Sequence, residues 1–146
     1  MSFKNSPWVM HFDTGSCNGC DMEIWAVLTP YYDIERFGAI NAANPKHADV
    51  LLFTGPVNKK SASRVQNLYE QVPEPKVVVA VGDCASTGAP FLDCYNTCRG
   101  ISSVIPVDVF IQGCAARPEA IIEGFAKAVQ ILEEKKRGSI WESTKR

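Results

Sequence analysis

The chain has 146 residues, the size of one domain, and its 46% apolar and 21% charged residues are ordinary for a globular protein. Its 15 basic and 16 acidic residues leave a net charge of −1 and form no basic stripe, which argues against a nucleic-acid partner. No apolar stretch approaches the roughly 20 residues that cross a bilayer, and the first residues carry no secretion signal, so we expect a cytoplasmic protein.

The first half of the chain alternates between apolar, β-branched runs and a helical pattern. Three strands are predicted, the second being the weakest, at residues 7–13, 34–37 and 48–54. Between the first two strands, acidic residues suit the positive start of a helix over residues 21–28, which ends before Pro30.

The second half continues this alternation. A helix is predicted over residues 61–71, a buried strand over 76–81, an irregular stretch over 85–100 and a last strand over 107–112. The final helix begins at Pro118, and its apolar side consists of Ile121, Ile122, Phe125, Ala128, Val129 and Leu132. Strands that alternate with helices predict a single α/β domain with a parallel sheet covered by helices on both faces.

Four of the six cysteines follow predicted strands. Cys17 and Cys20 form a C-x-x-C pair after the first strand, Cys84 follows the strand over 76–81, and Cys114 follows the last strand. Because the carboxyl ends of parallel strands lie at one edge of the sheet, we expect these four thiols to meet there. Four converging thiolates indicate a metal centre.

Three kinds of site use thiols in such patterns. A C-x-x-C pair is typical of thiol redox enzymes, but these need no further cysteines. Zinc binds four thiolates, although structural zinc usually takes two closely spaced pairs, and an α/β sheet does not need zinc to fold. The glycines Gly15, Gly19, Gly82 and Gly113 flank the motifs and favour an iron–sulfur cluster, because they let the backbone approach a bulky group. On residues alone, the zinc and dithiol interpretations stay open.

The remaining pair, Cys94 and Cys98, forms a C-x-x-x-C in the irregular stretch. We predict two ordinary thiols beside the site, with extra ligands or a redox pair as the alternative. A four-iron cluster needs no more than four cysteines, and the strand ends already supply them.

Other polar residues lie near the motifs in the sequence. For the acids we expect helix capping and loop solvation, with cluster tuning or proton transfer as the alternative; they are Asp13, Asp21, Glu23 and Asp83. His11 is expected to be a satisfied core histidine or a contact near the cluster. Arg117 is expected to form a helix-start salt bridge, or to pair with a partner carboxylate or the cluster.

The segments TGSCNGCDMEI, ADVLLFTGPVNKK, VVVAVGDCAS and VDVFIQGCAARPEAI together resemble one family. It is the iron–sulfur small subunit shared by [NiFe] hydrogenases and respiratory complex I. The resemblance covers residues 7–132 and implies a flavodoxin-like domain that binds one [4Fe–4S] cluster. The family's ligands correspond to Cys17, Cys20, Cys84 and Cys114. Residues 1–132 are then the cluster-binding domain, and residues 133–146 a charged C-terminal tail.

Three departures from the family's patterns select a branch. Asn18 and Gly19 separate the first two ligands, as in hydrogenases, whereas complex I subunits have adjacent cysteines there. An export leader and a second cluster domain, typical of uptake hydrogenases, are not expected here. Ser16 stands where those enzymes often have a glutamate, so the proton route assigned to it cannot be carried over. The chain therefore resembles the small subunit of membrane-bound, energy-converting hydrogenases, including the CO-induced and formate-hydrogenlyase types.

This resemblance implies an oxidoreductase subunit that transfers electrons and has no catalytic residue of its own. Electrons would pass from ferredoxin-type clusters through one proximal [4Fe–4S] cluster to a nickel–iron site, for proton reduction or hydrogen oxidation. Expected partners are the [NiFe] large subunit, a ferredoxin-like iron–sulfur subunit and integral membrane subunits, which would hold the chain at the cytoplasmic face of the cell membrane. The alternative is the equivalent subunit of a complex I-like oxidoreductase that reduces quinone or sulfur.

Overall fold

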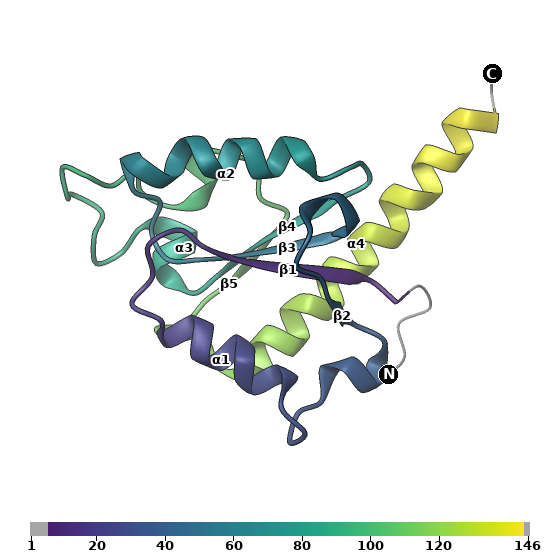
Figure 1. Ribbon diagram of the computed structural model, residues 1–146, viewed down its shortest axis with the longest axis horizontal. Helices are drawn as coiled ribbons and strands as arrows, with labels where there is room; N and C mark the ends of the chain where they lie inside the picture. The colour runs from purple at the N-terminus through teal and green to yellow at the C-terminus, as the bar shows by residue number, and fades with distance from the viewer. Residues whose placement is uncertain (1–5, 145–146) are drawn as a thin grey trace.

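A computed structural model describes residues 6–144 of the chain, with side chains as far as residue 138. Its centre is a five-stranded sheet (Figure 1), made of β1 (Trp8–Asp13), β2 (Ile40–Asn41), β3 (Val50–Thr54), β4 (Val77–Val81) and β5 (Val109–Ile111). Every strand pairs in parallel with its neighbours, in the order β2-β1-β3-β4-β5. This is the flavodoxin-like order, and it confirms the predicted fold class.

The two central strands are buried on both faces, as expected for a covered parallel sheet. Successive side chains of a strand point to opposite faces. In β3, Val50 and Leu52 therefore join one apolar cluster, and Leu51 and Phe53 join the other. The sheet thus separates two cores, and each core needs helices to cover it.

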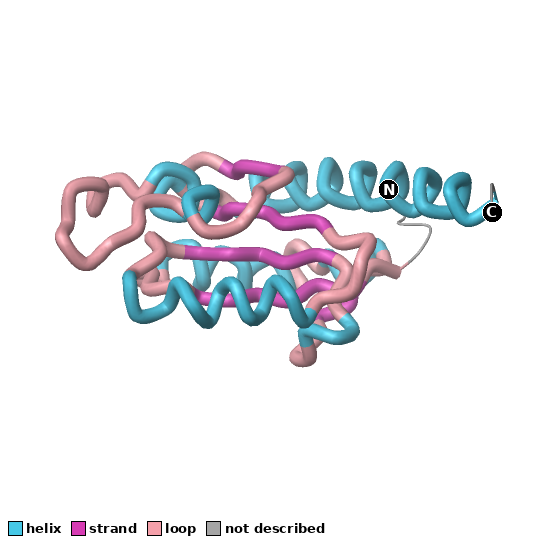
Figure 2. Tube along the Cα trace, turned by 90° about the horizontal axis from the view of Figure 1, so that it is seen from above, coloured by secondary structure: helices cyan, strands magenta, loops and turns pink. Residues whose placement is uncertain are grey.

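Helices cover both faces of the sheet, as predicted. On one face lie α1 (Gly19–Leu28) and α4 (Pro118–Thr144), and on the other lie α2 (Lys59–Gln71) and α3 (Asp83–Thr87) (Figure 1). The Asn58 side chain accepts the N–H of Ser61 at 2.8 Å and caps α2. Figure 2 shows the strands running side by side and α4 continuing beyond their ends.

The predicted strand at residues 34–37 is wrong. Ile34–Phe37 forms a 3₁₀ helix, and the second strand is Ile40–Asn41 instead. The residues on both sides, Asp33 (φ 46°) and Gly38 (φ 107°), have left-handed backbone conformations that an extended chain cannot include. The two other 3₁₀ helices of the described residues are Pro45–His47 and Ile101–Ser103, and the latter falls in the connection before β5.

The last helix is longer than the sequence pattern suggests, because α4 continues through Thr144 into the charged segment. Lys135 explains part of this extension. Its Nζ donates to Asp108 Oδ1 at 2.7 Å and to the carbonyl oxygen of Lys76 at 2.9 Å, so the helix is attached to the edge of the sheet. The division of the chain into a domain that ends at residue 132 and a tail that starts at residue 133 stays a prediction. The side chain of Trp141, in that tail, lies outside the side chains that the structure describes.

Candidate metal centre

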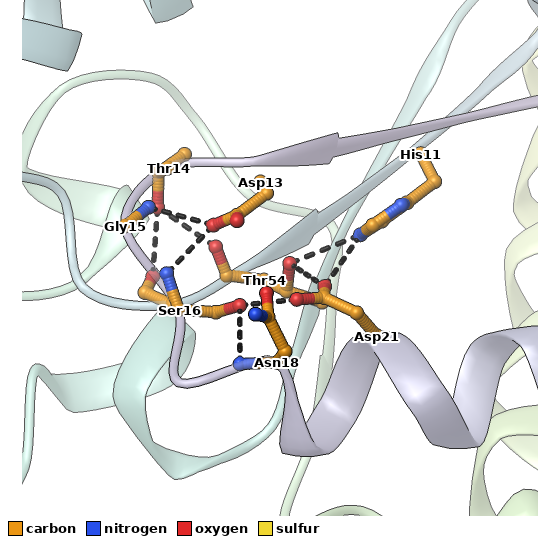
Figure 3. A network of polar contacts seen from close by, with 9 residues as sticks. His11, Asp13, Thr14, Gly15, Ser16, Asn18, Asp21 and Thr54 are labelled. Carbon is orange, nitrogen blue, oxygen red and sulfur yellow. Dashed lines mark hydrogen bonds and ion pairs between the residues drawn. The ribbon is translucent and has the colours of Figure 1, made fainter.

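The loop between β1 and α1 carries the first cysteine and is held by side chains of its own (Figure 3). Asp13 accepts the backbone N–H groups of Gly15 and Ser16 at 2.7 and 2.6 Å. The Ser16 hydroxyl in turn accepts the N–H of Asn18 at 3.1 Å. Asn18 has a left-handed φ of 67° and directly precedes α1, so Cys20 falls in the first turn of that helix.

The loops after β4 and β5 are joined by reciprocal hydrogen bonds. The N–H of Gly113 donates to Asp83 Oδ1 at 2.8 Å, and the N–H of Asp83 donates to the carbonyl oxygen of Gly113 at 3.1 Å. Asp83 is the first residue of α3. This pairing therefore holds Cys84, the next residue, beside the loop that carries Cys114.

Gly82 provides the room that Cys20 needs at this edge. A Cβ added to Gly82 would lie 2.5 Å from the Cys20 sulfur, and its φ of +87° disfavours any other residue. Gly55, after β3, has a φ of +80°, and a Cβ there would collide with the backbone of Ser16. Glycine at positions 55 and 82 thus allows the C-x-x-C loop to pack closely against the loops that follow β3 and β4.

Burial and neighbouring charges raise the pKa of two of the four predicted ligand thiols. Burial raises the pKa of the Cys20 thiol; the backbone N–H of Ala116 opposes this rise, and Cys17 and Cys114 add to it. Burial also raises the pKa of the Cys84 thiol, and the charges of the other three cysteines raise that pKa further. Two of the four thiols are exposed and two are half-buried. The structure brings them to one edge of the sheet, because the loops that carry Cys84 and Cys114 are hydrogen-bonded to each other and the Cys20 sulfur lies against Gly82.

These residues fit an iron–sulfur cluster by their chemistry. The donors come from three loops, are thiols throughout, and match the Cys₄ ligand set of a [4Fe–4S] cluster. Thiols with a raised pKa hold their protons until a cation replaces them, so metal binding would release protons. Among the side chains that the structure describes, no three of the His, Cys, Asp or Glu residues are placed so that they could hold a single metal ion. The ligand role of the four cysteines stays a prediction.

The second cysteine pair lies elsewhere. Cys94 is exposed in the connection after α3, and Cys98 is half-buried, with its N–H donating to the carbonyl oxygen of Val57 at 2.6 Å. Neither thiol is among the groups that shift the pKa of the predicted ligands. Their role as ordinary thiols beside the site stays a prediction.

A polar network connects the C-x-x-C loop to the ends of β1 and β3 (Figure 3). The Asp21 carboxylate, which directly follows Cys20, accepts the hydroxyl of Thr54 at 2.5 Å and the hydroxyl of Ser16. His11 Nε2 lies 2.8 Å from the same carboxylate. Sequence reasoning singled out Asp21 and His11 but missed Thr54. The sequence signal that could have identified Thr54 is its polarity, because Thr54 is the last residue of a strand that is otherwise apolar.

A small apolar groove opens on the face covered by α1 and α4. Its lining includes Ile24, Trp25, Leu52 and Phe125. His11 lines it as well, so the imidazole lies between this groove and the carboxylate network. The other residues singled out by sequence lie at the surface or near it: Arg117 is exposed and Glu23 half-buried.

A protein-family profile described as "NADH ubiquinone oxidoreductase, 20 Kd subunit" matches residues 17–128, a range that contains all four predicted ligands. The chain belongs to this family. The probable membrane-bound hydrogenase subunit mbhJ of Pyrococcus furiosus is 50% identical over 135 residues, which are 92% of this chain and 81% of that protein.

Other relatives belong to several oxidoreductase complexes. Formate hydrogenlyase subunit 7 of Escherichia coli is 42% identical over 90% of this chain, which spans 52% of that protein. A solved chain of the membrane-bound sulfane sulfur reductase, an archaeal respiratory membrane complex, is 38% identical with a TM-score of 0.77, covering 90% of this chain and 72% of that chain. An NAD⁺-reducing [NiFe]-hydrogenase, at 16% identity and a TM-score of 0.62, shares the fold and covers 79% of this chain and 86% of that chain.

The resemblance inferred from the sequence is thus confirmed. None of the helices found in residues 6–144 combines the length and the apolarity needed to cross a membrane.

Proposed function

We propose that Cys17, Cys20, Cys84 and Cys114 bind one [4Fe–4S] cluster, and that the chain is the electron-transfer subunit of an energy-converting [NiFe] hydrogenase. One observation carries this proposal: four thiols from three strand ends share one edge, in a chain that is 50% identical to a probable membrane-bound hydrogenase subunit. When bound, such a cluster would supply the one-electron chemistry that side chains alone perform poorly.

The chain's own residues would hold and adjust that group. The four thiols would give up their protons and bind as thiolates. The N–H of Ala116 already points to the Cys20 sulfur, where it lowers the pKa of the thiol. Hydrogen bonds to ligand sulfurs raise the reduction potential, whereas thiolate charge lowers it. Gly82 keeps the space beside Cys20 free of a side chain.

The exposure of the site supports an assembly with other subunits. Cys17 and Cys114 are exposed, so an isolated chain would leave its ligands open to water and oxygen. We propose that a [NiFe] large subunit covers this edge and that a ferredoxin-like iron–sulfur subunit delivers electrons. Integral membrane subunits would hold the chain at the cytoplasmic face of the cell membrane.

A second candidate is the equivalent subunit of a sulfur-reducing complex. The likeness to the membrane-bound sulfane sulfur reductase, at 38% identity and a TM-score of 0.77, favours it specifically. The large partner subunit distinguishes the two candidates. Two C-x-x-C pairs in that subunit, which bind nickel and iron, support a hydrogenase, and their loss supports the sulfur-reducing complex.

Anaerobic purification of the complete complex tests the proposal. We expect the Cys84→Ser complex to contain about four irons and four sulfides fewer than the wild type, and to lack one of the electron paramagnetic resonance (EPR) signals that the wild type gives under strong reductant. Nickel in the same preparation supports the hydrogenase assignment. Zinc without iron or sulfide would contradict the cluster, and so would thiol redox activity of the isolated chain that survives Cys84→Ser and Cys114→Ser.

A further inference from the structure

Asp21 is the only buried carboxylate among the side chains that the structure describes. Its residue exposure is 7%, whereas Asp13, in the same loop region, is exposed. A buried ionised carboxylate is costly unless hydrogen-bond donors surround it. Solubility explains acidic residues at the surface, but it does not explain a carboxylate at this buried position.

Three donors from three parts of the fold surround this carboxylate (Figure 3). Thr54, fully buried at the end of β3, donates to Oδ1 at 2.5 Å, and Ser16 of the loop donates to Oδ2. His11 Nε2 of β1 lies 2.8 Å from Oδ1 and 3.0 Å from the Thr54 hydroxyl. Because the ionised carboxylate can only accept, Nε2 carries the hydrogen of this contact.

Helix capping does not account for the arrangement. Asn18 is the residue that precedes α1, and it makes no side-chain cap bond. Both Asp21 oxygens are directed to side chains of the strands and the loop rather than to the first N–H groups of the helix. The carboxylate is thus buried and held in place by side chains, one residue from a predicted ligand.

We propose that Asp21 is a positioning residue, held by His11, Thr54 and Ser16, whose buried charge keeps the reduction potential of the adjoining cluster low. The inference rests on the proposed function, since it requires a cluster at Cys20. Reduction adds a negative charge to a cluster, and a nearby carboxylate shielded from water opposes this addition. Asp21 directly follows Cys20 in the first turn of α1, which places this charge beside the predicted ligand.

The test compares two Asp→Asn variants in the anaerobically purified complex by EPR-monitored redox titration. Asp21→Asn keeps the shape and removes the charge, and we expect the cluster's reduction equilibrium to shift about tenfold toward the reduced form, or ~59 mV for one electron. Asp13→Asn is the matched control from the same loop. Its carboxylate is exposed to water, so its removal should shift the potential much less.

Two further variants separate charge from loop structure. Thr54→Val and Ser16→Ala each remove one donor and keep the carboxylate, so they should move the potential in the opposite direction to Asp21→Asn. A purely structural role predicts that all three variants shift the potential the same way, and that result would overturn the inference. An unchanged potential in iron-loaded Asp21→Asn would overturn it too.

If Asp21→Asn fails to load iron, the two donor variants decide, and unchanged potentials in both would overturn the inference. Iron and sulfide contents are measured for every preparation. Wild-type complex without iron refutes the proposed function, whereas a loaded wild type with the wrong shifts refutes only the role of Asp21.

Discussion

The two cysteine pairs of this chain lie in loops built in different ways. The C-x-x-C loop follows a strand, and Asp13, Ser16 and Asp21 fasten it to the sheet through side chains. The loop that contains Cys94 projects from the fold, with exposed residues from Pro90 to Asn96. Spacing along the chain is similar in the two pairs. The prediction that Cys17 and Cys20, but not Cys94 and Cys98, belong to a shared site therefore depends on attachment to the strand ends rather than on the number of intervening residues.

Replacing the cysteines one at a time gives the largest expected effect. Serine at any of the four predicted ligand positions should remove about four irons and four sulfides from the complex, because a [4Fe–4S] cluster needs all four thiolates. Cys94→Ser and Cys98→Ser are the controls and should retain wild-type iron and sulfide. Iron loss in either control would show that the exposed loop contributes to the site.

Gly82→Ala should also damage the site while leaving every cysteine in place. The added Cβ would lie 2.5 Å from the Cys20 sulfur at a φ of +87°, so we expect a loss of roughly 2–4 kcal/mol in unfolding free energy and reduced iron content.

Gly138→Ala is the control for this variant, because a Cβ there meets nothing within 4 Å. In a helix it should stabilise the protein by about 0.5–1 kcal/mol. Denaturant unfolding measures both changes, and equal effects at the two glycines would contradict the close approach.

Removing one threonine hydroxyl from each loop compares how much the two loops contribute to the unfolding free energy. Thr14 is buried and donates to the carbonyl oxygens of Thr54 and Gly55 at 2.8 and 2.9 Å. Thr14→Val should therefore cost about 1–3 kcal/mol of unfolding free energy. Thr97 makes a similar contact with Phe91 O at 2.7 Å near the surface, and Thr97→Val should cost about 0.5 kcal/mol. Comparable losses would mean that both loops are equally important for stability.

Thiol reactivity provides the smallest and most local comparison. In metal-free protein, exposed Cys94 should react with iodoacetamide several-fold faster than half-buried Cys20 at pH 7.5. The pKa of the Cys20 thiol is raised above the ordinary 9.0 by burial. Its thiolate fraction, and with it the labelling rate, should therefore still increase beyond pH 9. Peptide mass spectrometry measures both rates, and a Cys20 rate that levels off below pH 8 would contradict the raised pKa.

Most of the fold could be predicted because its elements have strong local patterns. The apolar runs of β3 and β4 and the apolar face of α4 are visible in the sequence, and the structure confirms them with shifts of one or two residues at most strand ends. The prediction failed at Ile34–Phe37, where a short apolar pattern suits either a strand or a helical turn. Two left-handed residues beside it, Asp33 and Gly38, decided the outcome.

The candidate site could be predicted in part. The four cysteines follow strands, so a parallel sheet must bring them to one edge. The contacts of Asp21 could not be inferred in this way. Its partners Thr54 and His11 lie 33 and 10 residues away in sequence, and nothing local indicates that their side chains point to one carboxylate.

By itself, the sequence determined the fold class and which cysteines lie at the carboxyl ends of strands. Hydrophobic periodicity is a local property that identifies each strand and helix, and their alternation along the chain favours a parallel sheet, whose carboxyl ends lie at one edge. Tertiary structure alone decided that Asp21 is buried beneath the C-x-x-C loop and that Gly82 stands against the Cys20 sulfur. Both depend on how separate loops meet after the sheet has formed, and side-chain contacts between distant segments leave no periodic pattern in a single sequence.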